Sequence, residues 1–147
     1  MYEKEFTAGW GDMDLNSHMR NTAYLDRSSD IRMMYFSENG FPVAEFIRMR
    51  IGPVIRKDEV EYFREIHLLE MFKVTYCKAG LSEDGSRFIV RNEIFRNDGK
   101  LAARITSTGG WLDLTDRKLI LPPEPIFKAM QMLSATDDFQ MLASSIK

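Results

Sequence analysis

The stretch Trp10-Gly11-Asp12-Met13-Asp14-Leu15-Asn16-Ser17-His18-Met19-Arg20-Asn21-Thr22-Ala23-Tyr24 separates a short strand-like segment from the most helix-like part of the sequence. It gathers two carboxylates, two asparagines and one of the chain's two histidines. In the plainer interpretation, Asp12, Asp14 and Asn16 satisfy backbone N–H groups of a loop and a helix start. In the alternative the stretch is an active site, because unpaired N–H groups and the helix dipole favour an anion there.

The segments on either side predict a strand and a long helix. Residues 2–8 resemble a short opening strand. From Thr22 to Asn39, apolar and small side chains recur at helical spacing, and Gly40 and Pro42 follow as stop signals. This helix, about five turns long, is expected to be central to the domain. The segment 41–51 is ambiguous between a short helix and an extended chain.

The rest of the sequence predicts a sheet with a helical end. Four segments have the alternation or the flanking turn signals of strands: 59–66, 72–77, 87–96 and 100–114. Prolines 122 and 123 end the sheet, because proline cannot donate to a strand ladder. Apolar spacing at 126–133 predicts a further helix, and the residues from Ser134 onward are expected to be a terminal helix or a frayed tail. Residues 122–147 are therefore expected to form a C-terminal helical extension.

Consecutive hairpins favour an antiparallel sheet, and one long helix is available to cover its apolar face. The sequence thus predicts a single α+β domain over residues 1–147, with a long central helix wrapped by a curled antiparallel sheet. The edges of such a sheet need protection, and pairing between two copies is one common way to provide it.

Composition excludes several classes of function. A net charge of −2 and a pI near 5.7 argue against a nucleic-acid partner, which would require a basic face. No signal peptide and no apolar run of membrane-spanning length is present, so a cytoplasmic protein without a membrane partner is expected. Cys77 is the only cysteine, which excludes an intrachain disulfide and a thiolate metal cluster.

Standard catalytic motifs are also missing from the sequence. It has no glycine-rich phosphate loop, no paired-glycine nucleotide fingerprint and no Gly-x-Ser-x-Gly elbow. His18 and His67 lack a second ligand at metal spacing, so no metal site is expected. The plainer interpretation of His67 is a turn or edge histidine. Arg56-Lys57 is interpreted as the solvated start of a strand, with a phosphate contact as the alternative.

The stretch from Gly11 to Leu25 resembles the opening of the hotdog-fold acyl-CoA thioesterases, in the 4-hydroxybenzoyl-CoA thioesterase-like branch. Members of that family show a pattern close to (W/F)-G-D-x-D-x-x-G-H-V-N-N-x-x-Y-L. Both aspartates, His18, Asn21 and the Tyr24-Leu25 pair fall in register. Serine stands at position 17 where glycine is usual, and arginine stands at position 20 where the first asparagine is usual.

The resemblance implies a catalytic role for Asp14, as general base or nucleophile on a thioester carbonyl. It also implies that backbone N–H groups at the helix start form the oxyanion hole. Asn21 would orient water or the carbonyl. His18 would fix the loop, with direct catalysis as the lesser alternative, and Tyr24 would line the acyl pocket.

Two further implications concern the partner subunit and the departures from the pattern. In the family the sites lie at a dimer interface, so Arg56 and Lys57 of a second copy are candidates for contact with CoA phosphates. Ser17 is expected to be tolerated if its backbone φ is negative. Arg20 could hold an acidic acyl chain or a CoA phosphate, or it could mark the loss of catalysis.

The function expected from the resemblance is that of an acyl-CoA thioesterase, a homodimer or homotetramer, that uses no metal and no cofactor besides the CoA of its substrate. The first alternative is a non-catalytic hotdog protein that binds acyl-CoA or a small ligand. A dehydratase is the second alternative, and it is disfavoured because no histidine stands in the usual hydratase context.

Overall fold

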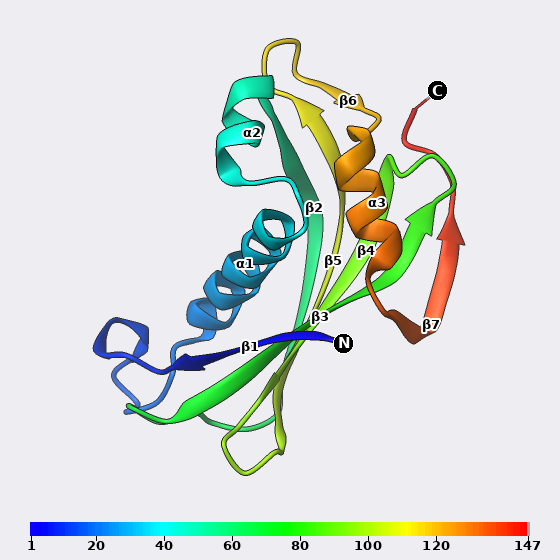
Figure 1. Ribbon diagram of the computed structural model, residues 1–147. Coiled ribbons are helices and arrows are strands. Elements are labelled where there is room, and N and C mark those ends of the chain that lie inside the picture. The colour runs from blue at the N-terminus through cyan, green and yellow to red at the C-terminus, as the bar shows by residue number, and fades with distance from the viewer. Residues whose placement is uncertain (147) are drawn as a thin grey trace.

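The structure, a computed structural model that describes residues 1–146, has an α+β architecture (Figure 1). Its elements are, in chain order, β1 (Tyr2–Thr7), the 3₁₀ turn η1 (Trp10–Asp12), α1 (Asn21–Glu38), α2 (Val43–Met49), β2 (Ile51–Tyr62), β3 (Met71–Ser82), β4 (Arg87–Phe95), β5 (Leu101–Asp113), β6 (Lys118–Ile120), α3 (Glu124–Met132) and β7 (Ala135–Leu142).

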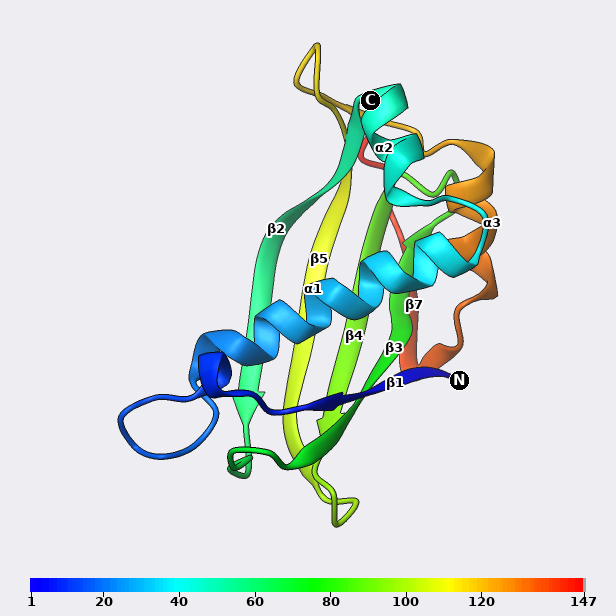
Figure 2. The ribbon, with the colours of Figure 1, turned by 60° about the vertical axis from the view of Figure 1, so that its left-hand side comes forward.

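The strands form one curled sheet, and α1 lies across one of its faces (Figure 2). The order is β1-β3-β4-β5-β2, with every neighbouring pair antiparallel. β6 pairs with the end of β5, and β7 pairs parallel with β3 beyond the end of β1. β1 and β7 therefore lie along one edge of β3, and β2 forms the opposite edge of the sheet.

The core lies between α1 and the sheet. Alternate residues of the three middle strands are buried: Phe72, Val74, Tyr76, Phe88, Val90, Ile94, Ala103, Ile105 and Trp111. The stripe on α1 that meets them consists of Tyr24, Ser28, Ile31 and Tyr35, and all four are buried as the helical spacing predicts. Each large apolar side chain buried here contributes about 1.5–3 kcal/mol to folding.

Most predicted elements are confirmed, but two strands differ in their bounds. The strand predicted at 72–77 continues further along the chain, as β3 from Met71 to Ser82. The opening strand, the long helix and the strands corresponding to β4 and β5 match to within one residue at either end. The ambiguous segment 41–51 contains the short helix α2. The strand predicted at 59–66 instead runs as β2 from Ile51 to Tyr62. The chain leaves the sheet after Tyr62, where the N–H groups of Phe63 and Arg64 both donate to the Ala102 carbonyl.

The prediction for the C-terminal end is wrong in part. Helix α3 lies within residues 122–147, but the segment from Ser134 is neither a helix nor a frayed tail. It forms β7, whose residues are largely exposed and which is held to β3 by backbone pairing. Because exposed edge residues need no apolar alternation, the sequence pattern did not indicate this strand. Because β7 pairs parallel with β3, the sheet is not purely antiparallel.

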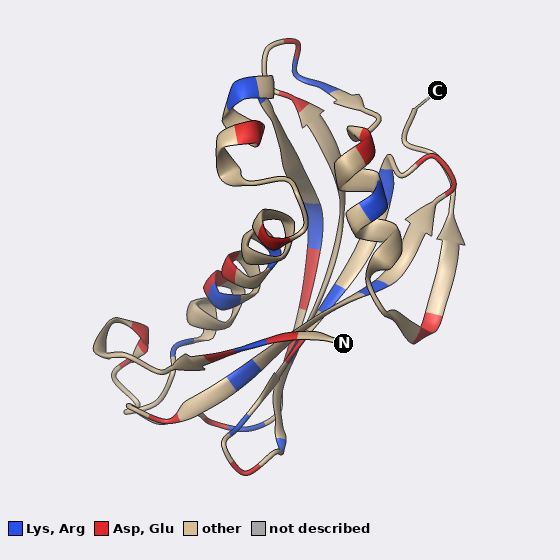
Figure 3. Ribbon diagram, in the orientation of Figure 1, with Lys and Arg blue, Asp and Glu red and all other residues tan. Residues whose placement is uncertain are grey.

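Charged residues are interspersed and gather in no single-sign stripe along the described chain (Figure 3). None of the helices in the described part of the chain is long and apolar enough to cross a membrane.

Candidate functional site

The polar stretch ahead of α1 forms a closed loop. Met13 and Met19 form an isolated antiparallel bridge across its base, and the Asp14 N–H donates to the His18 carbonyl at 3.0 Å. Met19 is buried, and its N–H donates to the Ile66 carbonyl at 2.8 Å, which fixes the loop to the segment after β2. Ser17 has a φ of +66°, so the negative φ under which we expected serine to be tolerated here is absent. Serine occupies a left-handed position that favours glycine.

Asp12 supports the loop and does not face the site. Its side chain is buried and lies 2.6 Å from a guanidinium nitrogen of Arg27 on α1, and its second oxygen accepts from the Gly9 N–H at 2.9 Å. A buried carboxylate paired in this way ties the 3₁₀ turn to the helix. These contacts are structural. They agree with the plainer interpretation of the stretch, in which Asp12 satisfies a backbone N–H group of the loop.

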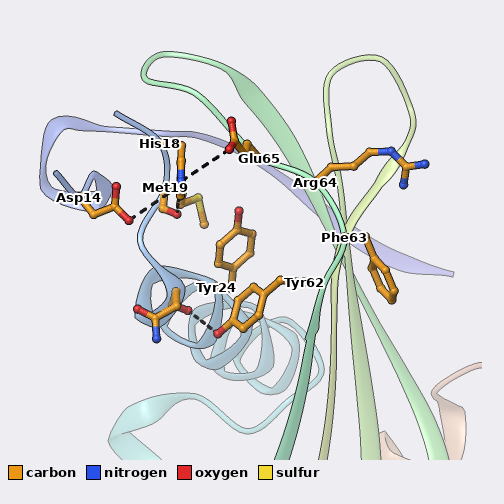
Figure 4. Close-up of a pocket in the computed structure, with 9 residues that line it drawn as sticks. Asp14, His18, Met19, Tyr24, Tyr62, Phe63, Arg64 and Glu65 are labelled. Carbon is orange, nitrogen blue, oxygen red and sulfur yellow. Dashed lines mark hydrogen bonds and ion pairs between the residues drawn. The ribbon is translucent and has the colours of Figure 1, made fainter. Parts of the chain in front are cut away.

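Four of the predicted site residues line one hollow of about 440 Å³. Asp14, His18 and Tyr24 lie on its loop and helix side (Figure 4). Asn21, the first residue of α1, is the fourth. Met19 also contributes, and the opposite wall is the end of β2 and its continuation, namely Tyr62, Phe63, Arg64 and Glu65.

Asp14 has one carboxylate oxygen engaged by the loop and one directed toward His18. Oδ1 accepts from the Asn16 N–H at 2.8 Å, while Oδ2 lies 3.8 Å from His18 Nδ1. On its other side His18 Nε2 lies 3.7 Å from Glu65 Oε1. Both separations exceed a hydrogen bond, so the imidazole stands between two carboxylates without a direct bond to either. The Asp14 side chain is 28% exposed, and Oδ2 accepts no hydrogen bond from the described residues.

Tyr24 provides a hydroxyl that stays protonated at neutral pH. Burial raises the pKa of Tyr24 to about 12, and nearby Tyr62 and the carboxylates of Glu65, Glu70 and Asp14 add to the effect. The Tyr24 ring packs edge-on against the Tyr62 ring, with centroids 5.4 Å apart. The phenol can therefore act as a hydrogen-bond donor beside Asp14.

The start of α1 forms the floor of the same hollow. Asn21 is its first residue, and its carbonyl accepts from the Tyr62 hydroxyl at 3.0 Å. The preceding residue, Arg20, makes no side-chain cap. The first N–H groups of a helix have no partner within the helix and carry the positive end of its dipole. The hollow thus combines a carboxylate with the anion-attracting end of a helix.

Arg20 is not among the residues that line this hollow. Its Nε donates to the Thr22 hydroxyl at 2.9 Å, and its Nη2 lies 3.5 Å from Asp26 Oδ2. Within one chain the Arg20 side chain therefore lies along the outer surface of the first turn of α1 and does not face Asp14. A contact with an acidic acyl chain or a CoA phosphate would require a different position of the side chain or a second subunit, and it stays a prediction.

Arg56 and Lys57 lie apart from Asp14 in the same chain. They occupy a bulge in β2, where the register with β5 shifts, and they line a separate hollow with residues of β4 and β7. Lys57 Nζ also lies 2.7 Å from Glu59 Oε1. Contact with CoA bound to a second copy stays a prediction.

The wall formed by Tyr62, Phe63, Arg64 and Glu65 was not predicted. These residues follow a simple strand alternation in the sequence, and nothing in their pattern signals a site. His67 lies in the turn after that wall, as its plainer interpretation predicts, and its N–H donates to Glu70 Oε1 at 3.2 Å. Among residues 1–146 no three His, Cys, Asp or Glu side chains are grouped so as to hold a metal ion.

Comparisons with known proteins bear on the family and the fold. The model of the thioesterase-like superfamily matches residues 8–140. A search of curated proteins gave no match.

Solved structures supply the remaining matches. The chain is similar to a 1,4-dihydroxy-2-naphthoyl-CoA thioesterase from Synechocystis, with 17% identity, a TM-score of 0.80 and coverage of 90% of this chain and 96% of that one. It is also similar to a gentisyl-coenzyme A thioesterase, with 17% identity, a TM-score of 0.78 and coverage of 88% and 99%. A third match is a hypothetical protein from Staphylococcus aureus in complex with CoA, with 19% identity, a TM-score of 0.79 and coverage of 88% and 80%. At these identities the matches show the fold.

Proposed function

Since the chain belongs to the thioesterase-like superfamily, we propose that it hydrolyses the thioester bond of an acyl-CoA to a free acid and CoA. The observation that carries the proposal is the position of Asp14. Its partly exposed carboxylate lines a hollow at the start of α1, with one oxygen engaged by the loop and the other without a hydrogen bond from the described residues.

In the proposed reaction a thioester carbonyl lies beside the first turn of α1. Asp14 removes a proton from water that attacks the carbonyl carbon, or attacks that carbon itself and forms an anhydride that water then cleaves. The negative charge that develops on the carbonyl oxygen is stabilised by the free N–H groups and the dipole of α1. The carbon–sulfur bond breaks, and the CoA thiolate takes up a proton.

The other residues of the hollow have supporting roles in the proposal. Asn21 orients the water or the carbonyl, and Tyr24 lines the acyl pocket, where its protonated hydroxyl can donate to the substrate. His18 fixes the loop, and its imidazole lies between the carboxylates of Asp14 and Glu65. The chemistry uses water and protein groups, and we propose no metal and no cofactor other than the CoA of the substrate.

We further propose that the enzyme acts as a dimer or tetramer. Among the strands of residues 1–146, β2 pairs only with β5, and its other edge is available to a second copy. Arg56 and Lys57 lie on this edge strand and are the candidates to contact the CoA phosphates of the neighbouring site. The similar proteins named as thioesterases act on aromatic acyl-CoA compounds, so aromatic substrates deserve equal weight with aliphatic ones.

The test is Asp14→Asn, assayed against a panel of aromatic and aliphatic acyl-CoA thioesters with detection of the released thiol. Loss of the general base or nucleophile is expected to lower the rate at least ~100-fold. The matched control is Asp137→Asn, which removes an exposed carboxylate from β7, outside the residues that line the hollow. Hydrolysis by Asp14→Asn at the wild-type rate, or no hydrolysis of any thioester by wild type, would contradict the proposal.

A second candidate is a protein that binds acyl-CoA without turnover. The observation that favours it is Arg20, which stands where the family pattern has asparagine, next to the first residue of α1. Saturable binding of an acyl-CoA in calorimetry, with no thiol release across the same panel, would support this candidate over the enzyme.

A further inference from the structure

A second hollow, of about 250 Å³, lies between α1 and the sheet and shares no lining residue with the Asp14 hollow. Most of its wall is aromatic or aliphatic, including Met33 of α1, Ile55 of β2 and Trp111 of β5. This volume is below the ~300–1,000 Å³ typical of pockets for drug-sized ligands. A small apolar molecule would fit, and a whole CoA would not.

The cation on this wall is Arg32, from the middle of α1. Its Nε and Nη2 donate to Asn92 Oδ1 at 3.1 and 2.9 Å, and Nη2 also donates to the Ser107 hydroxyl at 2.8 Å. Asn92 and Ser107 are both completely buried. These bonds hold the guanidinium in one orientation at the hollow.

The charge of Arg32 has no direct partner in residues 1–146, because none of their carboxylates lies within ion-pair distance of it. The Asp58 carboxylate is joined to it only through Ser107, whose hydroxyl donates to Asp58 at 2.5 Å. Burial lowers the pKa of Arg32, an effect that Tyr76 and Asp58 only partly oppose. The third nitrogen, Nη1, makes no hydrogen bond to the described residues. Arg32 is half-buried. Because charges withdrawn from water are normally paired, this guanidinium is suited to receive an anion.

We propose that the hollow binds a small carboxylic acid, either a monocyclic aromatic acid or a medium-chain aliphatic acid, with its carboxylate on Arg32 and its apolar body against Met33, Ile55 and Trp111. The proposal rests on this hollow and not on the thioesterase activity. Asp14 takes no part in it.

Trp111 supplies the reporter for a direct test. The chain has two tryptophans, and Trp10 is exposed, so Trp10→Phe leaves Trp111 as the sole indole. This variant is titrated with benzoate and octanoate, and with benzamide and octanamide as uncharged controls, by fluorescence and by calorimetry. One of the acids is expected to bind saturably and at least ~10-fold more tightly than its amide, because a charge-assisted bond to arginine is lost in the amide.

Variants separate this site from the Asp14 hollow. In the Trp10→Phe background, Arg32→Gln is expected to weaken acid binding at least ~10-fold. Asp14→Asn and Arg64→Gln, both in the other hollow, are expected to leave it unchanged. Ser29→Leu is included because Arg32→Gln also removes bonds to Asn92 and Ser107 and can unfold the protein. Ser29 is exposed on α1 at the margin of the hollow and takes no part in that network, so the larger side chain fills the space without disturbing it.

The proposal is overturned if neither acid gives a saturable change in fluorescence or heat. It is equally overturned if acid and amide bind alike, or if folded Ser29→Leu binds the acid as tightly as the background protein. Because none of these measurements involves hydrolysis, they are independent of the thioester assay. An inactive protein that binds octanoate through Arg32 would refute the proposed function and support this site.

Discussion

Ser17→Gly is expected to stabilise the protein, although a mutation to glycine usually destabilises. Ser17 has a φ of +66°, is exposed, and its side chain makes no hydrogen bond to the described residues. A residue with a Cβ in the left-handed region carries about 1–2 kcal/mol of strain, which glycine removes. Against this, glycine adds about 0.5–1 kcal/mol of conformational entropy to the unfolded chain.

The midpoints of these two ranges leave a gain of about 0.7 kcal/mol in the free energy of unfolding. For a chain of this size that corresponds to a melting temperature higher by about 1–4 °C. The loop is retained, because the bond from the Ser17 N–H to the Asp14 carbonyl involves only backbone.

The assay is thermal and urea unfolding followed by circular dichroism, with Asn16→Gly as the matched control. Asn16 is the preceding exposed loop residue and its φ is not positive, so glycine there carries the entropic cost without relief of strain. A loss of about 0.5–1 kcal/mol is expected for Asn16→Gly. If Ser17→Gly lowers the melting temperature as Asn16→Gly does, the inference of strain at position 17 is refuted.

Two further predictions concern the sheet and its C-terminal end. Gly109→Ala is expected to destabilise the protein by at least ~2 kcal/mol, because a Cβ would lie 2.2 Å from the Val54 carbonyl oxygen. Its control is Gly11→Ala. An added Cβ at Gly11 would have no atom within 4 Å, so the melting temperature is expected to change little. Burial opposes ionisation of Asp84, but hydrogen bonds from Ser144, Ser86 and Ser82 outweigh it and hold the pKa of Asp84 well below its usual 3.8. A depressed pKa stabilises the fold in full above the unfolded-state pKa, and this stabilisation declines as the pH falls from that value toward the folded-state pKa. The melting temperature of wild type should therefore fall more than that of Asp84→Asn between pH 5 and pH 3, and parallel curves would contradict this.

The sequence predicted the elements whose side chains repeat with a clear period. The stripe of α1 and the alternation of β4 follow from burial on one face, so they are visible without tertiary information. β7 was missed because its stability comes from backbone pairing with β3 and not from a buried face. The start of β2 was missed because Pro53 and the bulge at Arg56 interrupt its alternation.

The candidate site was predictable only on its local side. Asp14, His18, Asn21 and Tyr24 are close in sequence, and a single loop and the first turn of α1 bring them together. The opposite wall, residues 62–65, depends on the pairing of β2 with β5 and on the bond from Met19 to Ile66, neither of which has a local signature. The left-handed φ of Ser17 was equally hidden, because a serine gives no indication of it.

The way in which β1 and β7 share one edge of β3 limits how the sheet can grow. β1 runs antiparallel to β3 and β7 runs parallel to it, so the two lie end to end in opposite directions. A strand from another molecule could pair in a single direction with β1 over six residues or with β7 over eight, but not with both. Charged residues in β1 further disfavour pairing there. β2, with twelve residues, offers the long edge. Two copies joined there about a two-fold axis would each use up that edge, so association would stop at a closed pair instead of continuing into a fibre.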